Sequence, residues 1–230
     1  MSVRQKVPED LTARKALALE VIDRLKKEYP DAGCTLDYAH AWQLLVSVRL
    51  AAQCTDARVN IVVEDLFAKY PSVAALAAAE PEDIEAIVKP CGLGHSKARD
   101  ISACMRMLRD KYDCQVPATF EELLALPGVG RKSANLIMGD VFGKPAIVTD
   151  THCIRLCNRI GLVDGIKEPQ KVEMALWKII PPEEGSDLCH RFVMHGRAVC
   201  NARKPECEQC CLKTICRYAQ ERSGTQTAGS

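Results

Sequence analysis

The spacing of apolar residues constrains the fold of this chain most, because it follows the helical period over nearly the whole length. Along residues 11–28, Ala18, Val21 and Leu25 recur at intervals of three and four, as on one face of an α-helix. Helical patterns of the same kind cover residues 37–53, 56–69, 82–88, 96–112, 131–141, 169–180 and 186–199. Only residues 146–149 are a candidate strand. The sequence therefore predicts an all-α protein.

The composition agrees with helices and limits how the chain could bind a partner. Apolar residues make up 47% of the 230 residues and aromatic residues only 5%, which suits a helical core. The net charge is +1, so nucleic-acid binding would need a local basic patch and backbone amides. The first residues lack the pattern of a secretion signal, and no apolar run could span a membrane. We expect an intracellular protein without a membrane partner.

The cysteines fall into two groups. Eight of the thirteen are scattered through helical patterns and read as reduced, buried side chains. Four others form a C-x6-C-x2-C-x5-C pattern near the C-terminal end: Cys200, Cys207, Cys210 and Cys216. Zinc sites usually pair two short-spaced couples, whereas a [4Fe–4S] cluster accepts four thiolates at irregular spacing. The pattern favours the cluster over zinc, with Cys211 as a bystander.

A basic loop lies between the first two of these cysteines. It carries Arg203 and Lys204, and the segment 191–217 holds six lysines and arginines against two glutamates, a local net charge of +4. Such a segment is typical of a surface that binds phosphates, although a merely solvated loop is the alternative.

A glycine-rich turn, Leu-Pro-Gly-Val-Gly at 126–130, separates two predicted helices. Gly128 and Gly130 can adopt positive φ and expose backbone N–H groups, which, with the start of the next helix, suit a phosphate. A purely structural turn is the alternative. Arg131 and Lys132 follow at once, and the helix dipole there disfavours a charged amine, as a lysine nucleophile requires.

An acid follows eighteen residues after this lysine. Asp150 lies before a helix, where aspartate commonly caps the N-terminus, and the same carboxylate could instead stabilise positive charge on a sugar or accept a proton. Lys132 could likewise be only a solvated lysine or a phosphate contact. The spacing along the chain does not place the two together.

Taken together, LPGVGRK (126–132), VTDTH (148–152) and the cysteine pattern resemble the endonuclease III family of helix-hairpin-helix DNA glycosylases. The resemblance covers roughly residues 10–218. It implies a six-helix barrel domain at 34–144 and a second domain of 1–33 with 145–218 that holds a [4Fe–4S] cluster. The small, polar residues at the end of the chain predict a disordered tail at 219–230.

The resemblance also implies a chemistry. Lys132 matches the catalytic lysine that attacks C1′ of a flipped, damaged nucleotide, and Asp150 matches the catalytic aspartate. The Schiff base that forms allows β-elimination, which cuts the strand. The implied substrates are duplex DNA with oxidised or otherwise damaged pyrimidines and abasic sites. The implied protein is a monomer in the bacterial cytoplasm, associated with the nucleoid.

Further matches assign DNA contacts. LAAQCTD (50–56) resembles the family segment whose glutamine, here Gln53, fills the gap left by the flipped base. Leu93 matches the leucine that wedges the opposite strand. The DNA contacts expected from the hairpin, the VTDTH motif and the basic loop are Gly128, Gly130, Arg131, His152, Arg203 and Lys204.

The chain departs from the family pattern in two places. Gly94 and His95 stand where an aromatic and a polar residue are usual, which affects the expected opposite-base preference, and Thr149 replaces a common valine. Three other functions remain open: a monofunctional glycosylase, which would lack the hairpin lysine, a DNA-binding module without catalysis, and a structural zinc protein.

Overall fold

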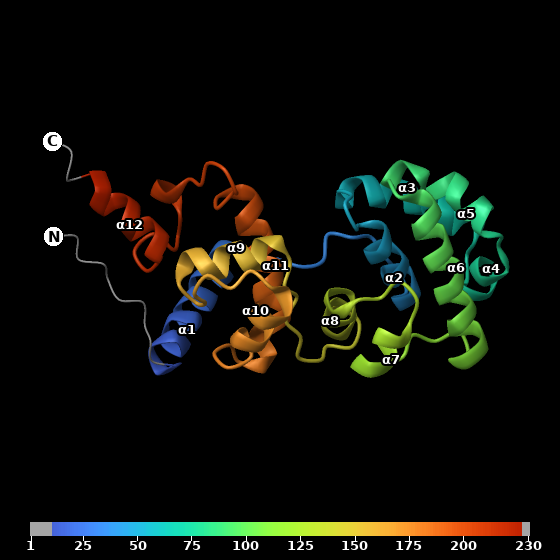
Figure 1. The fold of residues 1–230 in the computed structure, drawn as a ribbon, viewed down its shortest axis with the longest axis horizontal. Helices are drawn as coiled ribbons and strands as arrows, with labels where there is room; N and C mark the ends of the chain where they lie inside the picture. Colours follow the sequence, from blue (N-terminus) through green and yellow to red (C-terminus); the bar gives the residue numbers. More distant parts are fainter. Residues whose placement is uncertain (1–10, 227–230) are drawn as a thin grey trace. The chain divides into compact units, whose positions relative to one another are not determined.

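The computed structural model describes residues 11–226, with side chains to residue 222. Within this range every regular element is a helix and none is a strand, which confirms the all-α prediction. The chain divides into two compact units, Cys34–Lys144 and a second unit that joins Met1–Gly33 to Pro145–Ser230 (Figure 1). None of the described helices is both long enough and apolar enough to cross a membrane.

The unit Cys34–Lys144 is a succession of short helices whose starts follow from the sequence. Its elements are α2 (Ala41–Leu50), α3 (Asp56–Lys69), α4 (Val73–Ala78), α5 (Pro81–Val88), the 3₁₀ turn η1 (Lys89–Cys91), α6 (Gly94–Lys111), α7 (Phe120–Ala125) and α8 (Arg131–Asp140). The side chains of Thr55, Ser72 and Thr119 accept backbone N–H bonds at the starts of α3, α4 and α7. These caps satisfy donors that a helix start leaves open.

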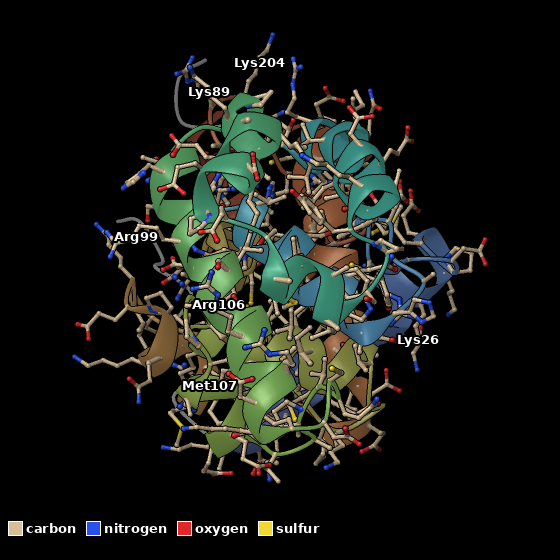
Figure 2. The ribbon with its side chains drawn as sticks, turned by 90° about the vertical axis from the view of Figure 1, so that its right-hand side faces the viewer. Lys26, Lys89, Arg99, Arg106, Met107 and Lys204 are labelled. Carbon is tan, nitrogen blue, oxygen red and sulfur yellow. The ribbon has the colours of Figure 1, made fainter. Side chains whose placement is uncertain are left out.

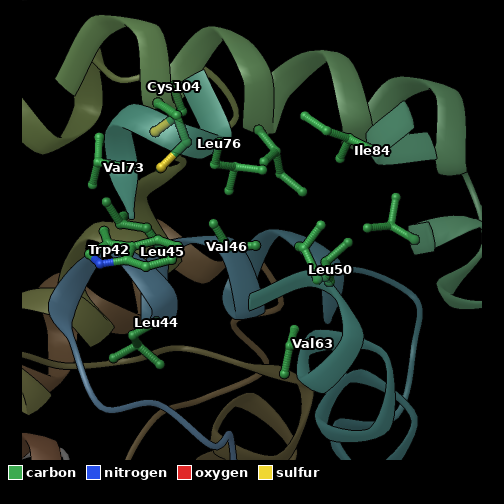
Figure 3. Close-up of a cluster of buried hydrophobic side chains, with 14 of the residues drawn as sticks. Trp42, Leu44, Leu45, Val46, Leu50, Val63, Val73, Leu76, Ile84 and Cys104 are labelled. Carbon is green, nitrogen blue, oxygen red and sulfur yellow. The ribbon is translucent and has the colours of Figure 1, made fainter. Parts of the chain in front are cut away.

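The core of this unit forms where α6 packs against α2, α4 and α5. Leu50, Leu76 and Ile84 are fully buried there (Figure 3). The ring of Trp42 meets that of Phe67 edge to face at a centroid distance of 5.1 Å. Burial of aliphatic side chains at this scale supplies most of the stability of a helical domain. It also holds the ends of α2 and α6 in fixed positions relative to each other.

The second unit brings the N-terminal helix to the C-terminal part of the chain. Its elements are α1 (Leu11–Glu28), α9 (Thr151–Ile160), α10 (Pro169–Leu176), η2 (Pro182–Glu184), α11 (Gly185–Ala198), η3 (Cys207–Gln209) and α12 (Arg217–Gln226). Helix α1 packs against α11. Arg14 of α1 and Arg217 of α12 both pair with Asp164, so one carboxylate joins two helices that are distant in sequence.

Three sequence predictions need correction. Residues 146–149 are buried but form no regular secondary structure and pair with no strand within the described chain; the N–H of Val148 instead donates to Cys189 Sγ at 3.2 Å. The helix predicted at 37–53 spans only Ala41–Leu50, because a left-handed turn at Gln53 ends it.

The third correction concerns the tail. The prediction of disorder at 219–230 is wrong for residues 219–226, which belong to α12, whereas residues 227–230 lie outside the described residues. Ala219 is buried, and the ring of Tyr218 lies between the guanidinium groups of Arg159 and Arg222, at 4.8 and 5.6 Å. The contact with Arg159 of α9 and the burial of Ala219 are tertiary interactions, and they stabilise a helix whose own sequence is polar.

Candidate active site and cysteine loop

The glycine-rich turn at 126–130 joins α7 to α8. The N–H of Val129 donates to the carbonyl of Leu126 at 3.1 Å, which closes the turn. Gly128 has φ +75°, in the left-handed region, but Gly130 has φ −99° and is the N-cap of α8. The prediction of positive φ therefore holds for the first glycine and is wrong for the second, which any residue could match in backbone conformation.

Gly128 is also confined by its neighbours. A Cβ at this position would lie 2.8 Å from Cβ of Asp100 and 3.1 Å from Cδ of Arg49. Arg49 Nε donates to Asp100 at 2.7 Å, and the same guanidinium donates to Ser96 at 3.2 Å. The turn therefore rests on an ion pair between α2 and α6, which fixes its position within the unit.

The two basic residues after the turn differ in their surroundings. Arg131, the first residue of α8, lies over the ring of Phe120 at 5.0 Å, which stabilises the α7–α8 pair. Lys132, the second residue, is exposed. The first backbone N–H groups of α8 have no partner within the helix and point toward its start, as an anion site requires. An exposed primary amine thus stands beside a potential phosphate site.

Gln53 and Leu93 lie on two other turns of the same unit. Both are exposed, and both adopt the left-handed backbone conformation that residues with a Cβ rarely adopt, with φ 57° and 53°. Leu93 is 57% exposed, which is unusual for a leucine. Strained, exposed residues of this kind cluster at functional sites. Without the resemblance, the sequence indicated a helix-end polar residue and a core leucine.

The departure at Gly94 and His95 has a local cause. Gly94 is the first residue of α6, and a Cβ there would lie 3.1 Å from the backbone Cα of Lys89. A larger residue here would therefore require the η1 turn to shift by a few tenths of an ångström. His95 is exposed, and its Nδ1 lies 3.0 Å from a carboxylate oxygen of Glu85.

Asp150 and His152 belong to the second unit, at the start of α9. Asp150 is the N-cap, and its Oδ1 accepts the N–H of Cys153 at 2.7 Å, so the capping role is present whatever else the carboxylate does. Arg155 donates to Nδ1 of His152 at 3.1 Å. The side chains of His152 and Arg155 pack against Gly196 of α11, where a Cβ would lie 2.4 Å from the imidazole of His152.

The four cysteines of the spaced pattern lie in one loop region around η3. Burial, together with the neighbouring Cys210 and Cys200 thiols, raises the pKa of Cys216 to about 11. Burial and the same two neighbours also raise the pKa of Cys207. The four thiols are therefore close enough to interact electrostatically. Between residues 11 and 226, no three His, Cys, Asp or Glu side chains converge as a site for a single metal ion.

Nitrogen atoms of Arg159 and His195 lie beside two of these thiols. Arg159 Nη1 donates to Cys200 Sγ at 3.3 Å, and His195 Nε2 lies 3.3 Å from Cys210 Sγ. The other ring nitrogen of His195, which is buried, lies 3.0 Å from the hydroxyl of Tyr29. Such N–H groups stabilise negative charge on sulfur, as metal-bound thiolates require. The sequence reasoning missed Tyr29 and His195, because nothing near them in the chain marks them.

Hydrogen bonds fix the two ends of the loop between Cys200 and Cys207. Arg159 and Arg155 donate to the carbonyls of residues 200–202, and the N–H of Glu206 closes the loop onto Val199 at 3.0 Å. Arg203 and Lys204 are exposed at its tip, and Lys204 extends outward (Figure 2).

The surface charge of this region is smaller than the sequence count of +4 indicated. Arg191 is buried and pairs with Asp187, Arg217 pairs with Asp164, and Lys213 pairs with Glu208. The count overestimated the patch because it treated every arginine and lysine as exposed. Arg203 and Lys204 remain as its exposed tip.

The hairpin, Lys132, Gln53 and Leu93 thus belong to one unit, whereas Asp150, His152, the cysteines and the basic loop belong to the other. Comparison with known proteins gives a consistent result. Residues 46–182 match the family described as HhH-GPD superfamily base excision DNA repair protein. Endonuclease III of Synechocystis sp. is 43% identical over 91% of this chain and 96% of its own length.

Two further proteins agree. Endonuclease III of Escherichia coli strain K12 is 37% identical over 90% of this chain and 98% of its own. A solved structure of a trapped endonuclease III–DNA covalent intermediate superposes with a TM-score of 0.86 at 41% identity, covering 91% of this chain and 98% of that one. With similarity along nearly its whole length, this chain belongs to the endonuclease III family of the HhH-GPD superfamily of base excision DNA repair proteins.

Proposed function

We propose that this protein is a bifunctional DNA glycosylase and abasic-site lyase that removes oxidised or damaged pyrimidines from duplex DNA, with Lys132 as the nucleophile. The observation that carries the proposal is the exposed amine of Lys132 at the second residue of α8, directly after a turn whose backbone suits a phosphate. Family membership supports the reaction class, since the relatives are endonuclease III enzymes and one was solved as a covalent intermediate with DNA.

Binding begins with the DNA backbone. A phosphate at the start of α8 accepts N–H groups of the first turn and interacts favourably with the helix dipole. Arg203 and Lys204 contact phosphates as point charges, independently of sequence. Because the damaged nucleotide must leave the stack to reach the amine, Gln53 fills the vacated space and Leu93 separates the opposite strand.

The first chemical step is a displacement at C1′. The lone pair of Lys132 Nζ forms the N–C1′ bond while the C1′–N bond to the base breaks, and the base leaves with that electron pair. We assign Asp150 to accept the proton that the amine loses and to stabilise positive charge on the sugar. Its Oδ1 is held by the N–H of Cys153, and that bond does not engage Oδ2.

The second step cuts the strand. Opening of the sugar ring gives a protonated imine between Nζ and C1′, which makes the C2′ proton acidic. Removal of that proton shifts its electron pair into a C2′–C3′ double bond, and the C3′–O bond breaks with the 3′ phosphate as leaving group. Hydrolysis of the imine then releases Lys132.

We also propose that Cys200, Cys207, Cys210 and Cys216 hold a [4Fe–4S] cluster. Four thiols in one loop region, with N–H donors on Cys200 and Cys210, fit a group in which each sulfur binds a different iron. When bound, the cluster would supply structural cross-links to the loop that presents Arg203 and Lys204. None of the steps above requires electron transfer.

The nucleophile is tested by borohydride reduction on duplex DNA that contains an abasic site. We expect the protein to form a covalent adduct, and Lys132→Ala to lose the adduct while it still binds the same duplex. Lys111→Ala, an exposed lysine elsewhere in this unit, is the matched control and should form the adduct normally. Adduct formation by Lys132→Ala would refute the assignment. Loss of duplex binding together with the adduct would favour a role in phosphate contact instead.

We also propose the class of lesion that the protein removes, its oligomeric state and its location in the cell. Cleavage assays over a panel of oxidised pyrimidines, damaged purines and mismatches should give the fastest excision for oxidised pyrimidines. We propose a monomer that acts on nucleoid DNA in the bacterial cytoplasm, which size-exclusion chromatography with and without a duplex can test. Fastest excision of a purine or of a mismatched thymine would overturn the substrate class and leave the lysine assignment intact.

A further inference from the structure

Lys97 is the least expected side chain in the unit Cys34–Lys144, because it is a lysine with 0% exposure. It lies in the first turns of α6, and its Nζ donates to the backbone carbonyls of Leu50 and Cys91, each at 2.8 Å. Burial lowers the pKa of Lys97, as expected for an amine without a carboxylate partner. A group that is costly to bury is thus placed against two carbonyls.

The two carbonyls belong to the two strained turns. Leu50 is the last residue of α2, directly before the turn that carries Gln53, and Cys91 is the last residue of η1, separated from Leu93 only by Gly92. Because both oxygens bind one nitrogen, they cannot separate by more than the two hydrogen bonds allow. The C-terminal end of a helix carries partial negative charge on its last carbonyls, so an ammonium group is a suitable bridge between two such ends.

Other contacts place the same two turns together. The two turns also bring the thiols of Cys54 and Cys91 near each other: burial first, and then the Cys54 thiol, raise the pKa of Cys91 to about 11. The backbone N–H of Lys97 donates to the carbonyl of Leu93 at 3.0 Å, so one residue contacts this turn through both its backbone and its side chain. An apolar side chain of similar length would fill the space without the dehydration cost, but it would leave both carbonyls without this donor.

We propose that Lys97 is a positioning residue that fixes the spacing of the Gln53 and Leu93 turns, so that both side chains enter the duplex in a single geometry. This inference rests on the proposed function, which gives those two side chains their place in DNA. Lys97 itself touches neither substrate nor reacting atoms. Its contribution is to hold two left-handed turns that the local sequence does not stabilise.

The test is a double-mutant cycle with Lys97→Met and Leu93→Ala. The readouts are the single-turnover excision rate of 5,6-dihydrouracil from a duplex and the fluorescence of 2-aminopurine opposite the lesion, which reports unstacking. Lys97→Met should slow excision by between about tenfold and a hundredfold, as expected for a misplacement of the order of an ångström. In the Leu93→Ala background, Lys97→Met should slow excision by less than about threefold, because the side chain that Lys97 positions is gone. The increase in 2-aminopurine fluorescence on binding should be lost equally in Lys97→Met, in Leu93→Ala and in the double variant.

A control separates positioning from general destabilisation. Leu76→Ala removes a fully buried side chain from α4, and all variants are assayed below their unfolding transitions. Equal slowing by Leu76→Ala and Lys97→Met would overturn the proposal, as would multiplicative effects of Lys97→Met and Leu93→Ala.

A second variant covers the case in which Lys97→Met does not fold. Lys97→Gln keeps amide donors on a shorter side chain and should show the same coupling to Leu93→Ala at smaller amplitude; the absence of coupling would overturn the proposal. Adduct formation on abasic DNA is measured in parallel. If Lys132 fails as the nucleophile while the cycle is still coupled, the proposed chemistry is wrong but the positioning inference stands.

Discussion

The two glycines of the 126–130 turn should differ strongly in how much stability the same substitution costs. Gly128→Ala adds a Cβ at φ +75° and places it 2.8 Å from Cβ of Asp100, an atom next to the backbone of α6. Gly130→Ala adds the same methyl group at φ −99°, with no heavy atom within 4 Å. The pair therefore separates the conformational and packing cost of the turn from the effect of an extra methyl group.

The cost of Gly128→Ala has two parts. The left-handed conformation costs a residue with a Cβ about 1–2 kcal/mol. Forcing a methyl group against Asp100 and Arg49 adds about 1–3 kcal/mol for overpacking, so the expected loss in the free energy of unfolding is about 2–5 kcal/mol. For Gly130→Ala, the gain from a less flexible unfolded chain and the loss of a favoured N-cap are each below about 1 kcal/mol and oppose each other.

Unfolding in urea can resolve this difference for the unit that contains the turn. The chain has two tryptophans, one in each unit, so in a Trp177→Phe background the fluorescence of Trp42 reports on Cys34–Lys144. We expect a clear decrease of the midpoint for Gly128→Ala with an unchanged slope, and a shift within about 1 kcal/mol for Gly130→Ala. Equal effects of the two substitutions, or a harmless Gly128→Ala, would refute the reasoning from φ and close approach.

Three further predictions concern the second unit. Gly185→Ala would place a Cβ 2.4 Å from the carbonyl oxygen of Ala146 and should cost at least about 1–3 kcal/mol, measured by urea unfolding. Burial raises the pKa of Asp164, but hydrogen bonds and charges from Arg217 and Arg14 outweigh it, so the pKa is lowered overall. The ionised carboxylate therefore stabilises the fold above the unfolded pKa, and this stabilisation is lost as pH falls through the folded pKa. Asp164→Asn should therefore cost less than about 1 kcal/mol at neutral pH, since the pair is half exposed, and nothing near pH 2; an equal cost at both pH values would contradict the assignment. Finally, Cys207→Ala should lose iron and acid-labile sulfide whereas Cys211→Ala retains both, and stoichiometric zinc in the unaltered protein would exclude the cluster.

The helices could be predicted because their signals are local. Thr55, Ser72 and Thr119 each precede an apolar period, and all three cap the helices expected from them. The end of α2 could not be found in the same way, because the residues around Gln53 include no proline or glycine to break the helix. The left-handed turn there depends on contacts with η1 and α6, which are forty residues away.

The candidate site shows the same division between local and tertiary signals. The glycine turn and the spaced cysteines stand out in the sequence, since each needs a particular residue type at a fixed interval. The number of charges on the basic segment did not predict the surface charge, because Arg191 is buried and Arg217 is bound by Asp164. A count of charges describes composition, whereas a phosphate responds to the charges that remain exposed.

Lys97 extends this argument to the residues that give a site its geometry. From sequence alone a lysine in the first turns of a helix is expected to be exposed, and no neighbouring residue indicates otherwise. The proposed role of Lys97 can be inferred only from the structure, in which its amine binds carbonyls at the end of α2 and the end of η1. The proposed DNA-contact roles of Gln53 and Leu93 come from matching motifs in relatives, but the contacts that hold their strained turns are distributed over the fold. A variant designed from the motifs alone would therefore keep the side chains proposed to contact DNA and lose the spacing between them.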